Sequence, residues 1–124
     1  MTDAREELLA ANDAFYAAFN AHDFEAMEQV WAESVTCICV HPGWMTLATR
    51  EAVLASWAAI LGNAAQPRVV PGSPLVTING DTGVVHCREF VAGSAIVATN
   101  IFVREGDRWR LAVHHGSGVA RMPG

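Results

Sequence analysis

The chain changes its hydrophobic pattern at Gly62, and this change limits the folds that it can adopt. Before Gly62 the longer apolar patterns repeat with the period of a helix, whereas the later segments are short β-branched runs that read as strands. Three Gly-containing turns, at 79–81, 92–94 and 105–107, separate four expected strands. Helices followed by a strand meander predict an α+β fold.

The N-terminal half contains three expected helices and one strand. The first helix covers 3–20, the second begins at the N-cap Asp23 and runs to Trp31, and the third covers 50–61 with Gly62 as its C-cap. Between the last two, residues 35–40 are rich in β-branched residues and predict a strand. Its end at His41-Pro42-Gly43 places His41 at the mouth of a loop.

Two strands of the meander have recognisable positions in a sheet. The strand over 68–78 contains Pro71 and Pro74, which lack a backbone donor, so we expect it at a sheet edge. The strand over 95–103 is mostly apolar on both alternating faces, so both faces should be covered. We expect the helices on one face and a second copy of the chain on the other.

The composition excludes several kinds of chemistry. All eight basic residues are arginines, so no lysine is available for Schiff-base catalysis, for pyridoxal phosphate or for a P-loop. The formal net charge of −5 argues against nucleic acid as a partner. With 124 residues, 52% of them hydrophobic, we expect one domain over 1–124 with one core.

The N-terminus favours a cytoplasmic protein, and the spacing of the cysteines and histidines indicates no metal site. Residues 1–15 are acidic and have no signal-peptide pattern, and no later apolar run is long enough for a membrane span, so no membrane partner is expected. Cys37, Cys39 and Cys87 match no zinc-ligand spacing, and the histidines form no HxH or HExxH pattern. We expect free thiols, no metal and no cofactor.

Four segments carry a family resemblance. They are AAFNAHDFEAM between the first two helices, CICVHPGW at the strand and loop, SWAAI in the third helix and DRWRLAVHHGS in the last strand. Together they resemble the nuclear transport factor 2-like superfamily, and more narrowly its SnoaL-like branch. The resemblance covers nearly the whole chain. It implies a cystatin-like fold, in which three N-terminal helices pack in a curved, mainly antiparallel sheet that forms a cone and encloses a pocket.

The resemblance leaves the reaction open. It implies a homodimer formed through the outer sheet face, and members include isomerases, cyclases, hydratases and epoxide hydrolases. The ketosteroid isomerases of this superfamily use a carboxylate base and an oxyanion hole of a tyrosine and a protonated aspartic acid. Matching the segments places Phe15 at the tyrosine position, Cys39 or His41 at the base position and Asn100 at the acid position. The lone Tyr16 is one residue away, so steroid isomerisation is disfavoured.

Three residues are candidates for catalysis. Alternation along 109–117 places His115 on the face with Trp109 and Leu111, which we expect to meet the helices. An inward His115 can serve as a general acid or base, and a buried structural histidine is the alternative. His41 lies in a loop that either caps a ligand cavity or closes the core. Asn100 must find hydrogen-bond partners, either in a ligand or in the protein.

The candidates for ligand binding come from several elements. Asn12 and Tyr16 are polar exceptions on the buried stripe of the first helix. Arg88 could bind a carboxylate, although solvent or a dimer salt bridge is the alternative. Aromatic residues supply apolar walls, with core packing as the alternative. The full set is Tyr16, Asn12, Trp44, Trp57, Cys39, His86, Arg88 and Phe102.

These residues suggest a pocket that binds a small, largely apolar molecule with a carbonyl, hydroxyl or carboxylate group. If the protein is an enzyme, we expect cofactor-free isomerisation, hydration or cyclisation, with a histidine as base and Asn100 or Tyr16 stabilising charge on oxygen. The alternative is a non-catalytic association or ligand-sensing module whose working surface is the outer sheet face.

Overall fold

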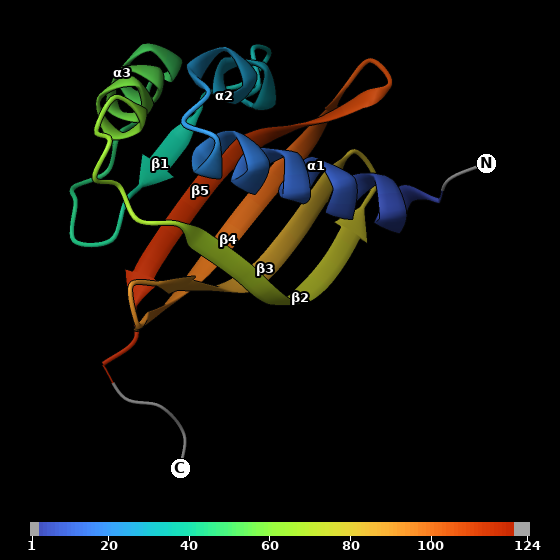
Figure 1. Cartoon of the computed structure of the whole chain (residues 1–124). Helices are drawn as coiled ribbons and strands as arrows, with labels where there is room; N and C mark the ends of the chain where they lie inside the picture. Colours follow the sequence, from blue (N-terminus) through green and yellow to red (C-terminus); the bar gives the residue numbers. More distant parts are fainter. Residues whose placement is uncertain (1–2, 121–124) are drawn as a thin grey trace.

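The computed structural model describes residues 3–120 and confirms the α+β fold. The helices lie together on one face of a curved five-stranded sheet (Figure 1). They are α1 (Ala4–Asn20), α2 (Phe24–Val30) and α3 (Arg50–Leu61). The strands are β1 (Ile38–Val40), β2 (Val69–Asn79), β3 (Thr82–Val91), β4 (Ser94–Glu105) and β5 (Arg108–Gly118).

Side-chain caps fix where each helix begins. Asp3, Asp23 and Thr49 each accept a hydrogen bond from the backbone N–H three residues later, at 2.7, 3.0 and 3.0 Å. Each cap satisfies one of the backbone donors that a helix leaves free at its N-terminus. At the other end of α3, the Gly62 N–H donates to Ala58 O, which confirms the expected C-cap.

The sheet has the strand order β1-β5-β4-β3-β2. The four long strands form the antiparallel meander that the turn signals predict, and β1 pairs in parallel with β5. The strand that carries Pro71 and Pro74 lies at the edge, as expected, and its register shifts between Gly72 and Leu75. The β2 edge of the sheet is therefore formed by a strand whose prolines cannot continue a regular ladder.

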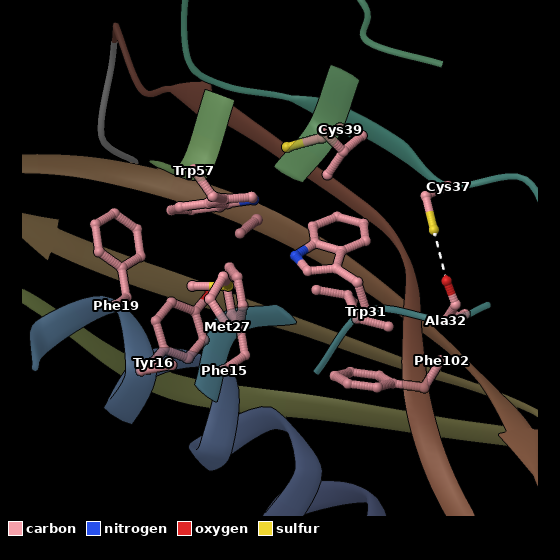
Figure 2. Close-up of a cluster of buried hydrophobic side chains, with 14 of the residues drawn as sticks. Phe15, Tyr16, Phe19, Met27, Trp31, Ala32, Cys37, Cys39, Trp57 and Phe102 are labelled. Carbon is pink, nitrogen blue, oxygen red and sulfur yellow. Dashed lines mark hydrogen bonds between the residues drawn. The ribbon is translucent and has the colours of Figure 1, made fainter. Parts of the chain in front are cut away.

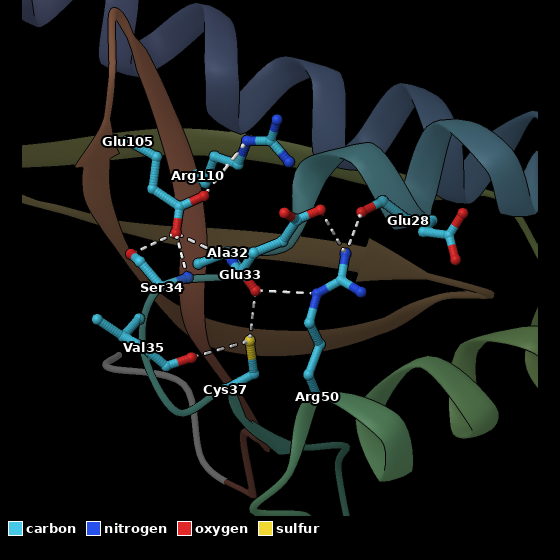
Figure 3. A network of polar contacts seen from close by, with 9 residues as sticks. All are labelled: Glu28, Ala32, Glu33, Ser34, Val35, Cys37, Arg50, Glu105 and Arg110. Atoms are coloured by element: carbon cyan, nitrogen blue, oxygen red, sulfur yellow. Dashed lines mark hydrogen bonds and ion pairs between the residues drawn. The ribbon is translucent and has the colours of Figure 1, made fainter.

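The first strand is shorter than the 35–40 range that the sequence suggests. The Glu105 carboxylate accepts the backbone N–H groups of Glu33 and Ser34, at 2.9 and 2.7 Å (Figure 3). On the other side, the Arg50 guanidinium donates to Ala32 O at 3.0 Å. Side chains therefore hold residues 32–34, together with one backbone bond from the Ala32 N–H to Leu111 O, and regular pairing with β5 begins only at Ile38.

A bulge in β5 reverses the expected orientation of its two histidines. Ile101 pairs with Val113 and Phe102 pairs with Leu111, so Ala112 is an extra residue between them. One extra residue shifts the alternation of every later side chain to the opposite face. The expectation for the end of the strand is therefore wrong: His114 faces the helices and His115 is exposed on the outer face.

Aromatic side chains fill the space between the helices and the sheet (Figure 2). The Trp57 ring lies edge-on to Phe15 and Phe19, with centroid distances of 5.4 and 4.8 Å. Trp57 and Phe102 are both fully buried. The sequence left open whether these aromatic residues form pocket walls or pack in the core. Core packing is the role that fits Phe102, and Trp57 packs in the same cluster.

The corner between α1 and α2 is tied to the sheet by one side chain. The Asn20 amide accepts the Val69 N–H at 2.8 Å and donates to Val69 O at 2.7 Å. Beyond it, His22 has a φ of 54° and a ring nitrogen 3.0 Å from Leu61 O. The FNAHD segment therefore anchors the end of α1 both to the start of β2 and to the end of α3.

Replacing Asn20 should destabilise the fold measurably. We expect Asn20→Ala to lower the free energy of unfolding by about 2 kcal/mol, because the backbone groups of the buried Val69 lose both partners. Urea unfolding followed by circular dichroism measures the change. Asp13→Ala, at an exposed position of the same helix, is the control; a loss no larger than its loss would contradict the anchoring role.

Candidate functional site

One cavity of about 260 Å³ lies between the helices and the inner face of the sheet, below the loop after β1. Its walls are mostly apolar, and three of its lining side chains are buried and polar: His41, Glu89 and His114. The other lining residues are Phe19, Pro42, Trp44, Ile60, Gln66, Val69, Val91 and Ile96. An apolar cavity with a few convergent polar groups is typical of a small-molecule site.

Glu89 is the central residue of this cavity, and the sequence analysis did not identify it. Its side chain is 3% exposed and faces the helices from β3. The signal was present in the alternation of this strand, because Val85 and Cys87 are buried on the same face. An acidic residue on the same strand face as two core residues must either be paired with another polar group or have a functional role.

A chain of hydrogen bonds connects Glu89 to the interior. The Tyr16 hydroxyl donates to Glu89 Oε2 at 2.5 Å. The Asn100 Nδ2 donates to the Tyr16 oxygen at 3.1 Å and to Asn12 Oδ1 at 2.9 Å. Asn100 Oδ1 lies 2.6 Å from His114 Nδ1. Asn12, Tyr16 and Asn100, all selected from the sequence, therefore form one network, although none of them lines the cavity itself.

His114 takes the position that the sequence analysis gave to His115. It lies directly across the strand pair from Asn100, and its side chain is 2% exposed. Because Asn100 presents its oxygen, His114 Nδ1 carries the proton, and Nε2 is the nitrogen left for a ligand. The ring packs against Phe15 and lines the cavity.

His41 also lines the cavity, from the loop that follows β1, as its position at the strand end suggested. Its Nε2 lies 2.9 Å from Ser56 Oγ, whose own proton goes to Val53 O at 2.7 Å. His41 Nε2 must therefore be the donor, and Nδ1 is left unprotonated. Cys39 lies beneath the ring, with Sγ 3.6 Å from Nε2.

Burial shifts the pKa of each ionisable group around the cavity in the direction of its neutral form. It lowers the pKa of His41 to about 4. Burial, with smaller contributions from His41 and His115, lowers the pKa of His114 to about 3. Burial also raises the pKa of Glu89, although the hydrogen bond from Tyr16 acts in the opposite direction. Both histidines are therefore neutral near pH 7 and present lone pairs rather than charges.

The thiol and the phenol nearest these groups are held in their protonated forms. Burial raises the pKa of the Cys39 thiol to about 12. It also raises the pKa of Tyr16, and the nearby Glu89 carboxylate adds to the shift. Neither group is a ready source of negative charge, so Cys39 is not an activated nucleophile and Tyr16 acts as a hydrogen-bond donor.

Several residues selected from the sequence lie elsewhere. His86 and Arg88 are on the outer sheet face, in register with Thr99 and Val97, so their assignment to the pocket is wrong. His115 is exposed on the same outer face. Trp44 does line the cavity, at its rim, where it is 49% exposed and stacks edge-on against His41 at 4.7 Å.

Within residues 3–120, no group of three or more His, Cys, Asp or Glu side chains is arranged to hold a metal ion. No helix in the same range has the length and apolar character needed to cross a membrane.

The fold, with an apolar cavity between its helices and its sheet, is that of the NTF2-like class. The model of the SnoaL-like domain family matches residues 8–122, and the chain belongs to this family. No match was found among curated proteins.

Solved structures extend this comparison. A proposed dehydratase of the NTF2-like family from Streptomyces avermitilis is 33% identical, with a TM-score of 0.87 over 94% of this chain and 96% of that one. A proposed calcium/calmodulin-dependent protein kinase type II association domain from Thiobacillus denitrificans is 36% identical, with a TM-score of 0.80 over 89% and 93%. An NTF2-like protein from Cytophaga hutchinsonii, at 19% identity and a TM-score of 0.79 over 95% and 100%, shares the fold.

The neutral histidines predict how stability depends on pH. The free energy of unfolding should fall as the pH drops from 6.5 towards 4, because the unfolded chain binds protons that folded His41 and His114 do not bind. Each histidine adds a slope of about 1.4 kcal/mol per pH unit. Chemical unfolding at several pH values should show a shallower fall for His114→Asn and an unchanged fall for His115→Asn. Equal slopes in both variants would refute the assignment.

Proposed function

We propose that the protein is a cofactor-free acid–base enzyme that adds water to, or eliminates it from, a small and largely apolar oxygenated molecule. The observation that carries this proposal is the buried Glu89 carboxyl group at the wall of an apolar cavity. A carboxylate with a raised pKa in such a place is a stronger base than one in water. Isomerisation and cyclisation use the same kind of proton transfer.

In the dehydration direction, one carboxyl group can complete the reaction. Glu89 removes a proton from the carbon next to the one that carries the hydroxyl group, and a carbon–carbon double bond forms. The resulting carboxylic acid returns this proton to the departing hydroxyl group, so water is released and Glu89 is ionised again. Tyr16 positions the carboxyl group through its bond to Oε2. His41 and His114 accept hydrogen bonds and orient the substrate.

The expectation that Asn100 or Tyr16 stabilises an oxyanion needs revision. The Asn100 donors are committed to Asn12 and Tyr16, and the Tyr16 proton is committed to Glu89. Neither residue lines the cavity. A water elimination in which Glu89 carries one proton from the substrate carbon to the leaving hydroxyl group, without a full negative charge on a substrate oxygen, fits this arrangement better. Similarity to the proposed dehydratase from Streptomyces avermitilis supports the choice of water elimination.

A general proton-abstraction probe tests the base. The isoxazole ring of 5-nitrobenzisoxazole opens when a base removes the proton on C3 and the N–O bond breaks, and the nitrophenolate product absorbs visible light. We expect the protein to accelerate this opening, with kcat/KM rising with pH as Glu89 ionises. Glu89→Gln should lower kcat/KM at least about tenfold, because an amide cannot take the proton.

Two variants make the test specific. Glu6→Gln removes an exposed carboxylate of α1 and should leave kcat/KM unchanged. Tyr16→Phe keeps the carboxylate but removes its hydrogen bond, so it should move the pH profile rather than abolish activity. Equal rates for the Glu89→Gln and Glu6→Gln variants would refute Glu89 as the base.

We also propose that the protein acts as a cytoplasmic homodimer that associates through the outer sheet face, which an association module would use as well. Val84, Ile101 and Val113 form a half-buried row across the centre of this face. Phe90 and Leu75 extend its apolar surface and are 46% and 68% exposed. The 36% identity to the proposed association domain supports this assembly.

A charge in the centre of this row should break the dimer. We expect Ile101→Arg to sediment as a monomer in analytical ultracentrifugation, because an unpaired buried charge at an apolar interface is costly. Gln29→Arg, at an exposed position of α2, should remain dimeric. A wild-type protein that sediments as a monomer at high concentration would refute the proposed homodimer.

A further inference from the structure

The three buried polar groups of the cavity share a property that bears on the ligand. Glu89, His41 and His114 are each bound by the protein on one side. In each case the protein determines whether the atom that remains available to a ligand is a hydrogen-bond donor or an acceptor. Donors at the rim, on Trp44 and Gln66, are partly exposed to solvent and therefore discriminate less between ligands.

The state of His114 follows from Glu89 through three hydrogen bonds. An ionised carboxylate can only accept, so the Tyr16 hydroxyl donates to it and can only accept from its other two neighbours, Asn100 and the Cys87 thiol. This requires the Asn100 NH₂ group to face Tyr16, and its oxygen then faces His114. His114 is thereby held with its proton on Nδ1 and a lone pair on Nε2. Tyr16 and Asn100 are positioning residues for this lone pair.

His41 reaches the same state through a different route. The Ser56 hydroxyl gives its proton to Val53 O, one helical turn earlier in α3. The Ser56 oxygen can then only accept, and it lies 2.9 Å from His41 Nε2. His41 Nδ1 therefore carries a lone pair, and the protein group placed to donate to it is the Cys39 thiol, with Sγ at 3.9 Å, a weak donor that a ligand hydroxyl group can replace. Two separate networks therefore leave two acceptors in the lining of one cavity.

We propose that the cavity selects a neutral ligand that carries at least two hydroxyl groups and discriminates against carboxylates. This inference rests on the proposed function of the Glu89 site, whose substrate class it narrows. A hydroxyl group donates to an imidazole lone pair or a carboxylate, whereas an ether or carbonyl oxygen leaves that acceptor unpaired. Among the described residues that line the cavity there is no arginine, so a second carboxylate would face Glu89 without a counter-charge.

The volume of the cavity and the charge of its polar groups restrict the class of ligand further. A cavity of about 150 Å³ already holds benzene, so the 260 Å³ here accommodates one substituted ring or a chain of similar length. An ammonium group is a poorer match than two hydroxyl groups, because two of the three acceptors are uncharged imidazoles. The Phe19, Val69 and Ile96 walls complete an apolar surface for the rest of the molecule.

A series of matched aromatic compounds tests the inference by binding alone. At pH 8, we expect resorcinol, with two hydroxyl groups, to bind more tightly than 3-methoxyphenol, and the latter more tightly than 1,3-dimethoxybenzene. Each methylation should raise Kd about fivefold, because it removes one donor. NMR titration measures the three values. Equal affinities, or tighter binding of 3-hydroxybenzoate or benzylamine than of resorcinol, would overturn the proposal.

Variants locate the effect in the cavity. His41→Phe should reduce the advantage of resorcinol over 1,3-dimethoxybenzene, because one acceptor is lost. His115→Phe, the matched change on the outer face, should retain the full advantage. A His115→Phe variant that loses as much selectivity as His41→Phe would place the binding site elsewhere.

The protonation of the rings is an independent readout in the wild-type protein. Nitrogen-15 NMR should show His114 with a protonated Nδ1 and an unprotonated Nε2, and His41 with the reverse pattern. The opposite pattern at His114 would overturn the proposal. Binding without opening of 5-nitrobenzisoxazole would refute only the enzymatic function, whereas ring opening without hydroxyl selectivity would refute only this inference.

Discussion

The buried amide of Asn100 is the interaction on which the arrangement of the cavity depends. Asn100 is fully buried on β4, and its two donors and its oxygen bind Asn12, Tyr16 and His114. A buried polar group without its partner costs about 1–3 kcal/mol. Because these partners come from α1 and β5, only one placement of α1 over the sheet satisfies all of them. The same placement brings the Tyr16 hydroxyl to Glu89 on β3 and closes the network at the cavity wall.

Local signals in the sequence are sufficient for most of the fold. Caps such as Asp23 and turn glycines such as Gly80 act within a few residues, so the boundaries they predict agree with the structure. The bulge at Ala112 is different, because it depends on how β5 matches β4 and not on the pattern of β5 alone. A prediction based on strict alternation therefore assigned His114 and His115 to the wrong faces of the sheet. The shortened β1 has a similar cause, since Glu105 binds backbone donors far away in the sequence.

The candidate site was predictable where a polar residue interrupts an apolar pattern. Tyr16 and Asn100 stand out in this way, and both belong to the network. Glu89 lies between two exposed residues, Arg88 and Phe90. An acidic side chain in such a segment is usually solvated. Its burial depends on the hydroxyl of Tyr16, which only the folded chain brings within 2.5 Å. Alternation along β3 puts Glu89 on the same face as Val85 and Cys87, and this was the one local sign that it faces the core.

The same physics links the stability of this interior to its selectivity. Each polar group at the cavity is half satisfied by the protein, so folding leaves acceptors whose second partner must come from water or a ligand. Neutral histidines are suited to this role because they hold a lone pair in an apolar wall without the desolvation cost of a charge. A ligand that lacks a matching hydroxyl displaces water and leaves the acceptor unpaired, which costs more than the hydrogen bond itself would contribute. Discrimination in such a site therefore comes chiefly from the penalty on wrong ligands, and a rigid hydrogen-bond network is what maintains that penalty.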